Sequence, residues 1–210
     1  MAETTGVAVI EPRENGPLRV QGVKELRNSR GEAIRTEETF FLCRCGASQN
    51  KPFCDGTHKK IGFSGARVSE SVPAIKEYAG GQITIHDNRS VCAHAGYCTD
   101  RSPNVFRMKK EPWIEPDGDR ADKTVATIKM CPSGALSYSI NRAAQQTEST
   151  MPCIRILKDG PYFVTGGPQL ICDRAPHIAE RYTLCRCGAS RNKPYCDGSH
   201  WNSGFKDDKN

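Results

Sequence analysis

Short stretches of alternating apolar and polar residues recur along the chain, and long amphipathic periods are rare. Leu18 and Val20 alternate with polar neighbours, as do Tyr182 and Leu184, so both stretches predict half-buried strands. Residues 39–42 predict a further extended stretch. Glycine and proline residues separate these stretches and indicate tight turns. The pattern therefore predicts small, β-rich units.

A middle region, residues 74–141, has a mixed pattern. Its predicted elements are a strand at 82–86, a helix at 122–130 and a closing strand at 135–140. Leu136, Tyr138 and Ile140 are expected on one side of the closing strand, because side chains alternate across a strand. Residues 141–150 are polar and without periodicity, which predicts a linker.

The chain repeats itself on either side of this middle region. Residues 10–20 align with residues 154–164 at an offset of 144, and the alignment continues from Cys43 onward at an offset of 142. The repeat predicts two domains, 1–68 and 149–210. Units of this size bury little apolar surface and need a further source of stability. A mean hydropathy of −0.60 also argues against one large core.

The strongest motif occurs once in each repeat: Cys-x-Cys and then, after eight residues, Cys-x3-His. The first copy consists of Cys43, Cys45, Cys54 and His58, and the second of Cys185, Cys187, Cys196 and His200. Three thiolates and one imidazole suit an iron–sulfur cluster or zinc. The Asp-Gly pair before each histidine predicts a helix start, which places the histidine in a first helical turn.

Each copy fits the pattern Cys-x-Cys-x2-(Ser/Thr)-x3-Pro-x-Cys-Asp-Gly-(Ser/Ala/Thr)-His, and both therefore resemble the CDGSH, or mitoNEET-like, iron–sulfur family. The resemblance implies that the three cysteines and the histidine of each copy bind a [2Fe–2S] cluster. In that family two protomers pair around a two-fold axis. We expect the two copies to make this pair within one chain, as a monomer with internal pseudo-two-fold pairing, because a lone copy would leave strand edges exposed.

The middle region carries a second kind of cysteine motif. Cys92 and Cys98 are six residues apart, and a distant Cys131 precedes a proline. The region resembles single-cluster ferredoxins, and still more closely the divergent mono-cluster ferredoxins of bacteria. Those with four irons use a middle cysteine, but Ala95 stands at that position here. A [3Fe–4S] cluster held by Cys92, Cys98 and Cys131 is therefore favoured.

Several alternatives stay open at this point. The central cluster could be [4Fe–4S] with His94 or Cys153 as fourth ligand, or a ferredoxin-like fold could have lost its cluster. The repeated motif could hold structural zinc, although zinc sites favour ligand pairs that are two to four residues apart. Disulfides are disfavoured by the odd total of 11 cysteines. Cys153 and Cys172 lie outside the repeated motif and are interpreted as small buried hydrophobic residues.

These inferences predict an α+β protein. Two small β-rich CDGSH zinc-finger-like domains form an intrachain pseudo-dimer, with an inserted ferredoxin-like α+β domain between them. The formal charge of +6 is spread among acidic residues, so a solvated surface is expected rather than a nucleic-acid partner. No apolar run suits export or a membrane span, and we expect a cytoplasmic protein without a membrane partner.

The sequence contains no catalytic triad, phosphate-binding glycine loop or dinucleotide fingerprint, and no enzyme activity is expected. Iron–sulfur clusters predict one-electron transfer with a redox partner protein. The alternative is transfer of a cluster to an apo acceptor, or redox or pH sensing, because a histidine-ligated cluster is labile when the imidazole protonates.

Overall fold

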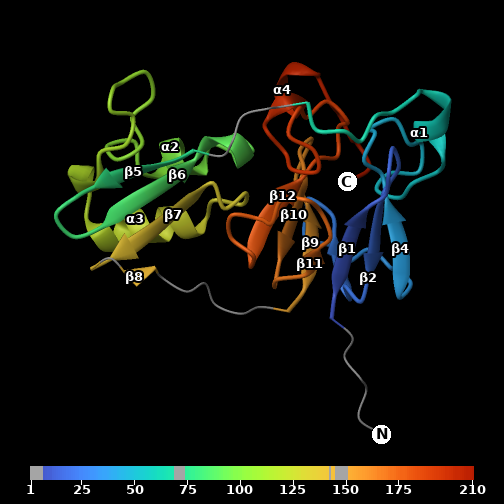
Figure 1. Cartoon of the computed structure of the whole chain (residues 1–210), viewed down its shortest axis with the longest axis horizontal. Coiled ribbons are helices and arrows are strands. Elements are labelled where there is room, and N and C mark those ends of the chain that lie inside the picture. The colour runs from blue at the N-terminus through green and yellow to red at the C-terminus, as the bar shows by residue number, and fades with distance from the viewer. Residues whose placement is uncertain (1–6, 69–73, 142, 145–150) are drawn as a thin grey trace, which may run out of the picture.

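The structure is a computed structural model that describes residues 7–68, 74–141, 143–144 and 151–210. Within these residues, three four-stranded sheets and a few short helices make a small, β-rich protein. Figure 1 shows two of the sheets next to each other, with the third sheet and its helices to one side of them.

The first sheet has the spatial order β11, β1, β2, β4. Its strands are β11 (Gln169–Leu170), β1 (Val9–Pro12), β2 (Leu18–Gln21) and β4 (Thr39–Leu42). A turn closed by the Arg13 amide, which donates to the Pro17 carbonyl at 2.9 Å, joins β1 to β2. Leu18 and Val20 are fully buried, which confirms the alternation that the sequence predicts.

The second sheet has the spatial order β12, β10, β9, β3. Its strands are β12 (Arg181–Leu184), β10 (Tyr162–Thr165), β9 (Cys153–Ile156) and β3 (Glu25–Arg27). The Leu157 amide closes the turn between β9 and β10 on the Pro161 carbonyl at 3.0 Å, as Arg13 does in the first repeat. All four residues of β12 are buried, so this strand is covered more fully than the alternating sequence predicts.

The two repeats exchange one strand each. β3 belongs to the first repeat but pairs in parallel with β9, and β11 belongs to the second repeat but pairs in parallel with β1. The registers are equivalent, since Leu26 lies opposite Ile154 and Leu170 lies opposite Ile10, and these are aligned positions of the repeat. Each sheet therefore needs a strand from the other repeat.

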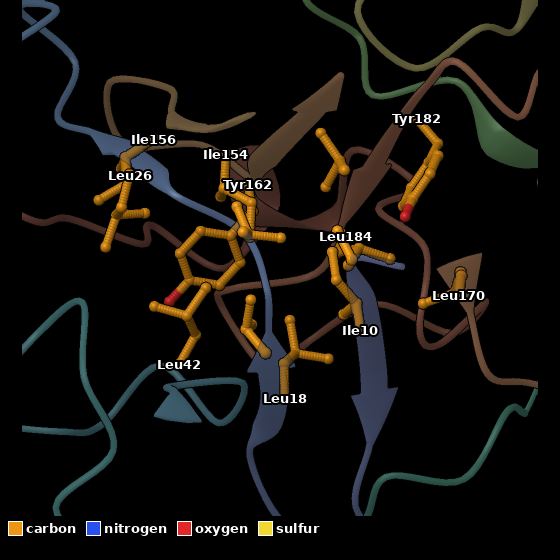
Figure 2. Close-up of a cluster of buried hydrophobic side chains, with 14 of the residues drawn as sticks. Ile10, Leu18, Leu26, Leu42, Ile154, Ile156, Tyr162, Leu170, Tyr182 and Leu184 are labelled. Atoms are coloured by element: carbon orange, nitrogen blue, oxygen red, sulfur yellow. The ribbon is translucent and has the colours of Figure 1, made fainter. Parts of the chain in front are cut away.

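The apolar side chains of both repeats form one core. Figure 2 shows Ile10, Leu18 and Leu42 of the first repeat in one cluster with Ile154, Tyr162 and Leu184 of the second. Each is at most 1% exposed. Full burial of one such side chain stabilises a fold by about 1.5–3 kcal/mol, so a shared core ties the two repeats together.

The middle region forms the third sheet, in the order β5, β6, β7, β8. The strands are β5 (Ile75–Ala79), β6 (Thr84–Asn88), β7 (Leu136–Ile140) and β8 (Ala143–Ala144). The helices are η1 (Arg89–Val91), α2 (Tyr97–Arg101), η2 (Pro116–Gly118) and α3 (Ala121–Lys129). β6, α3 and β7 match the three predicted elements to within about two residues, whereas the other elements of this region were not predicted.

One detail of the predicted closing strand is wrong. Leu136 and Tyr138 pack into the central core, as expected, but Ile140 is 36% exposed. Ile140 lies at the end of β7, where its partner is the short β8, so its side chain extends past the core. The short β8 lies within the predicted linker, residues 141–150, of which 142 and 145–150 lie outside the described residues.

The middle region docks on the second repeat. The buried Arg181 guanidinium, at the start of β12, donates to the carbonyls of Ile128 and Leu136 at 3.3 and 3.2 Å. Gly134 lies against the Arg181 carbonyl, where an added Cβ would be only 2.9 Å away. In the first repeat, Thr39 stands at the position of Arg181. Figure 1 accordingly shows the third sheet on the β12 side of the molecule.

Among the described segments, the helices all fall short of the length and apolar character that crossing a membrane requires.

Candidate metal centres

The first donor set lies on a loop that follows β4 directly. The Cys43 amide donates to the Pro52 carbonyl at 2.8 Å, and the Cys54 amide donates to the Phe41 carbonyl at 2.9 Å, so the loop folds back on its own strand. The Cys43 and Cys45 sulfurs are 3.7 Å apart. His58 lies in the short helix α1 (Thr57–Lys60), with its Nδ1 3.3 Å from the Cys54 sulfur.

The second donor set repeats this geometry after β12. The Cys185 and Cys187 sulfurs are 3.8 Å apart. His200 lies in α4 (Ser199–Asn202), with its Nδ1 3.4 Å from the Cys196 sulfur. Figure 1 shows α1 and α4 at the same end of the two sheets. The predicted placement of each histidine in a first helical turn is confirmed.

The donors of each loop come as two close pairs. In residues 7–68, 74–141, 143–144 and 151–210, no group of three or more His, Cys, Asp or Glu side chains is arranged to hold a single metal ion. A pair of donors at each end of a loop instead suits a group with two irons, because each iron of a [2Fe–2S] cluster takes two protein ligands. The thiolate and imidazole donor set fits the same group.

The central cysteines come together in a separate cavity. Cys92 follows η1, Cys98 lies in α2 and Cys131 follows α3. All three line a cavity of about 320 Å³, far larger than the roughly 10–15 Å³ that one water needs. Burial, followed by the neighbouring Cys131 and Cys92, raises the pKa of Cys98 to about 11. Three thiols that line one cavity are costly to ionise without a cation, so they fit an iron–sulfur group.

Comparisons with known proteins agree with this division of the chain. A profile described as "Iron-binding zinc finger CDGSH type" matches residues 15–59 and 159–201, and one described as "Divergent 4Fe-4S mono-cluster" matches residues 78–141. Two relatives, each called uncharacterized protein YjdI, come from Escherichia coli (strain K12) and Escherichia coli O157:H7. Each is 39% identical over 61 residues, which are 29% of this chain and 80% of the relative.

The chain belongs to the CDGSH iron–sulfur family. It carries two CDGSH domains, one on each side of a divergent mono-cluster domain. The search of solved structures gives no match. Below, the N-terminal CDGSH site is Cys43, Cys45, Cys54 and His58; the C-terminal CDGSH site is Cys185, Cys187, Cys196 and His200; the central site is Cys92, Cys98 and Cys131.

The aspartate of each CDGSH motif positions the histidine helix. Asp55 accepts hydrogen bonds from the Thr57 and Gln49 amides at 3.0 and 2.8 Å. Asp197 accepts the equivalent bonds from Ser199 and Arg191 at 3.0 and 2.8 Å. The amide bonds hold the pKa of Asp55 well below its usual range, the Thr57 amide having the largest effect. A carboxylate at this point therefore ties the start of the helix to the cysteine loop.

The cysteines of a CDGSH site affect one another's ionisation. Burial raises the pKa of Cys45 to about 11, and the adjacent Cys43 and Cys54 contribute. In the C-terminal site, a hydrogen bond from Cys185 lowers the pKa of Cys187, and the same bond raises that of Cys185. Thiols this close do not all ionise unless positive charge compensates them, which is what bound iron provides.

The two CDGSH loops touch each other. A Cβ at Gly46 would lie 2.4 Å from the Cys187 carbonyl oxygen, and one at Gly188 would lie 2.5 Å from the Cys45 carbonyl oxygen. Both glycines have positive φ, at 80° and 83°, which glycine adopts without steric cost. The lack of a side chain also allows the two loop backbones to approach each other closely. The Tyr162 hydroxyl also crosses from the second repeat to donate to the Cys43 carbonyl at 2.8 Å.

The arginine between the first two cysteines of each motif is buried, but its partners differ. Arg44 donates to the Gly16 and Arg13 carbonyls at 2.9 and 2.6 Å. Arg186 donates to the Gly160 carbonyl at 2.8 Å and also forms a fully buried ion pair with Asp207. The C-terminal loop is therefore held by a charge pair that the N-terminal loop does not share.

Three residues beside the central site escaped sequence reasoning. Arg89 donates to the Cys92 sulfur at 3.4 Å, and its guanidinium lies 3.6 Å from the Trp113 ring centre. Asp87 is 3% exposed and accepts hydrogen bonds from Arg89 and Trp113, both at 3.1 Å. No sequence signal links these three residues, because β6, η1 and the loop that carries Trp113 bring them together only in the fold.

The two cysteines outside the motifs are only partly buried, not fully buried as expected. Cys153 lies on β9, where burial raises its pKa and Glu25 raises it further. The Cys172 thiol donates to the Arg174 carbonyl at 2.8 Å. Of the candidate fourth ligands of the central site, His94 lies at the edge of the cavity, whereas Cys153 pairs with Glu25 of β3 in the second sheet.

Proposed function

We propose that the protein is an electron carrier with three iron–sulfur sites and no enzyme activity of its own. The observation that carries the proposal is that three separate donor sets, rich in thiols, are each brought together by the fold. The two CDGSH sites would each hold a [2Fe–2S] cluster and the central site a [3Fe–4S] cluster. A bound cluster of these kinds exchanges one electron without making or breaking a bond in a substrate.

The protein's own residues set the environment of each site. A neutral imidazole in place of a fourth thiolate leaves less negative charge at the metal, which raises the reduction potential relative to all-cysteine ligation. The guanidinium of Arg89 acts in the same direction at the central site, because it donates to the Cys92 sulfur at 3.4 Å. A redox protein is the expected partner, since no substrate-binding motif was found in the sequence.

We further propose that the two CDGSH repeats form an intrachain pseudo-dimer, and that the middle region is an inserted ferredoxin-like domain. The exchange of β3 and β11, with equivalent registers, supports the first part. Within one chain, β11 pairs with β1 and β3 pairs with β9, so these strands do not need a second copy of the chain as a partner. A monomer is therefore expected. Light scattering tests this, and an obligate dimer would contradict it.

A four-iron central cluster is the second candidate, because the matching profile is described as "Divergent 4Fe-4S mono-cluster". Ala95 lines the cavity and offers no donor, which favours three irons. His94 also lines the cavity and could supply a fourth donor. Iron and acid-labile sulfide analysis separates the two, and so does spin resonance of anaerobically purified protein, since an oxidised three-iron centre is paramagnetic.

The electron-transfer proposal requires reversible reduction in which iron and sulfide are retained. A competing role as a cluster donor or sensor is favoured by one observation, the half-buried position of Cys54 and His58. Mixing the holoprotein with an apo ferredoxin distinguishes the roles: a carrier keeps its clusters, and a donor loses them to the acceptor. A colourless protein with stoichiometric zinc and no labile sulfide would contradict both the electron-carrier role and the donor or sensor role.

A further inference from the structure

The loop that carries two of the central cysteines lies directly on the C-terminal CDGSH loop. A Cβ at Gly198 would lie 2.4 Å from Cδ2 of His94, so the His94 ring packs against the backbone there. Gly198 is two residues from both Cys196 and His200. The His94 ring therefore lies between the central cavity, whose edge it lines, and the donors of the C-terminal site.

A second contact joins the same two loops. The Asn192 side chain donates to the Ser90 carbonyl at 2.6 Å, and Ser90 precedes Cys92 by two residues. The donor groups are also close enough to influence one another. Burial lowers the pKa of His200, and His94 lowers it further. Burial raises the pKa of Cys196, and Cys92 is among the groups that raise it further.

The N-terminal CDGSH loop makes neither contact. Gly56 has nearly the same φ as Gly198, 87° against 85°, yet in the described structure a Cβ there meets no atom within 4 Å. Asn50, the counterpart of Asn192, is exposed. The N-terminal loop instead touches the C-terminal loop, through Gly46 and the Cys187 carbonyl.

We propose that His94 is a positioning residue that places the central site beside the C-terminal CDGSH site, so that the C-terminal site is the middle one of three in space. This inference rests on the proposed function, because it takes each donor set to hold a cluster. The order in space is central, C-terminal, N-terminal, whereas the order along the chain is N-terminal, central, C-terminal. The two end sites are those that outside redox proteins can approach most directly.

Spin resonance of the full-length holoprotein during a reductive titration tests this order, at the stage where the CDGSH centres are reduced and the central three-iron centre is still oxidised. Two paramagnetic centres broaden each other's signals when they are close. We expect the central signal to be broadened in the wild type, to sharpen in Cys196→Ala, and to stay broadened in Cys54→Ala. If Cys54→Ala sharpens the central signal as much as Cys196→Ala does, the proposed order is wrong.

A matched pair of glycine variants tests the His94 contact without removing a ligand. Gly198→Ala and Gly56→Ala impose the same backbone strain, but only the methyl at 198 meets His94. We expect Gly198→Ala to change the central signal and Gly56→Ala to leave it unchanged. We expect His94→Ala to speed iron loss from the C-terminal site to a chelator about tenfold, the lower end of what losing an outer-shell partner costs.

The outcomes separate this inference from the proposed function. Iron and labile sulfide are measured first, and their absence from the wild type would end the proposed function itself. If clusters are present but Gly198→Ala and Gly56→Ala affect the central signal equally, only the role of His94 fails. If His94→Ala removes iron from the central site and leaves the C-terminal site unchanged, His94 is a ligand and its positioning role is wrong.

Discussion

The two CDGSH sites share their local structure but not their surroundings. The paired cysteine sulfurs are 3.7 and 3.8 Å apart, and the cysteine–histidine distances are 3.3 and 3.4 Å. His58 is half-buried, whereas His200 is 6% exposed. The motif therefore determines the donor geometry, and the rest of the chain determines how far solvent reaches the donors.

Three neighbours account for the difference. The central domain covers the C-terminal loop through His94, Asp207 pairs with the arginine of that loop, and Arg181 fixes the central domain to β12. From the other repeat, the N-terminal loop accepts hydrogen bonds from Tyr162 and from Lys209, which donates to the Gln49 carbonyl at 2.9 Å. The comparison teaches that equal motifs in one chain need not give equally buried sites.

Removal of one cysteine is expected to have the largest effect. Cys54→Ala and Cys196→Ala should each abolish one CDGSH cluster, and because ligation is part of folding, the loss of unfolding free energy should exceed about 4 kcal/mol. Cys196 is buried, so its repeat should be the more destabilised. Iron content and thermal unfolding measure this. Equal melting temperatures for the two variants would show that the sites are alike after all.

Breaking the buried ion pair between Arg186 and Asp207 is expected to have the second-largest effect on stability. Arg186→Leu leaves the buried Asp207 carboxylate without its opposite charge, which should cost about 3–5 kcal/mol. Arg44→Leu leaves carbonyl groups unsatisfied and should cost about 1–3 kcal/mol. Urea unfolding of the holoprotein gives both values. The double variant Arg186→Leu/Asp207→Leu is the control and should recover most of the loss, because it leaves no unpaired charge.

Tyr162→Phe tests support from the other repeat. The Tyr162 hydroxyl donates to carbonyls of the N-terminal loop, so its loss should cost about 1–3 kcal/mol and speed iron release from that loop. Tyr182→Phe is the control, since that hydroxyl donates to the Pro168 carbonyl at 2.9 Å, away from either site. If both variants release iron at the wild-type rate, Tyr162 does not support the N-terminal site.

The smallest effect is expected at the second inter-loop contact. Asn192→Ala removes the hydrogen bond to the Ser90 carbonyl and should cost about 1 kcal/mol. The exposed Asn50 is the matched control, and Asn50→Ala should have no measurable effect. Thermal unfolding of Asn192→Ala and Asn50→Ala, compared with the wild type, measures the two costs. An equal cost at both positions would mean that the contact contributes nothing.

The sequence predicts the sites better than their arrangement. The CDGSH spacing predicts paired donors and a histidine at a helix start, and both are present, because they depend on bonds within about sixteen residues. In the middle region, β6, α3 and β7 are also close to their predicted positions, since local periodicity sets them. Cys92, Cys98 and Cys131 line one cavity, and their role as ligands stays a prediction.

The exchange of β3 and β11 and the docking of Arg181 could not be predicted in the same way. β3 and β11 are three and two residues long, too short for a periodic signal. Arg181 looks like an ordinary surface arginine until its guanidinium reaches carbonyls that are more than forty residues away in sequence. Contacts of this kind depend on how whole units pack, which no local pattern records.

The exchanged strands have a consequence for how such a molecule can diverge. Two identical subunits that swap strands must present two identical sites, since every change in one appears in the other. Here the swap joins halves of one polypeptide, so Tyr162 can stand where the other half has Leu18, and Arg181 where it has Thr39. Because the two halves belong to one polypeptide, their sequences can differ, and each CDGSH site can acquire its own neighbouring residues.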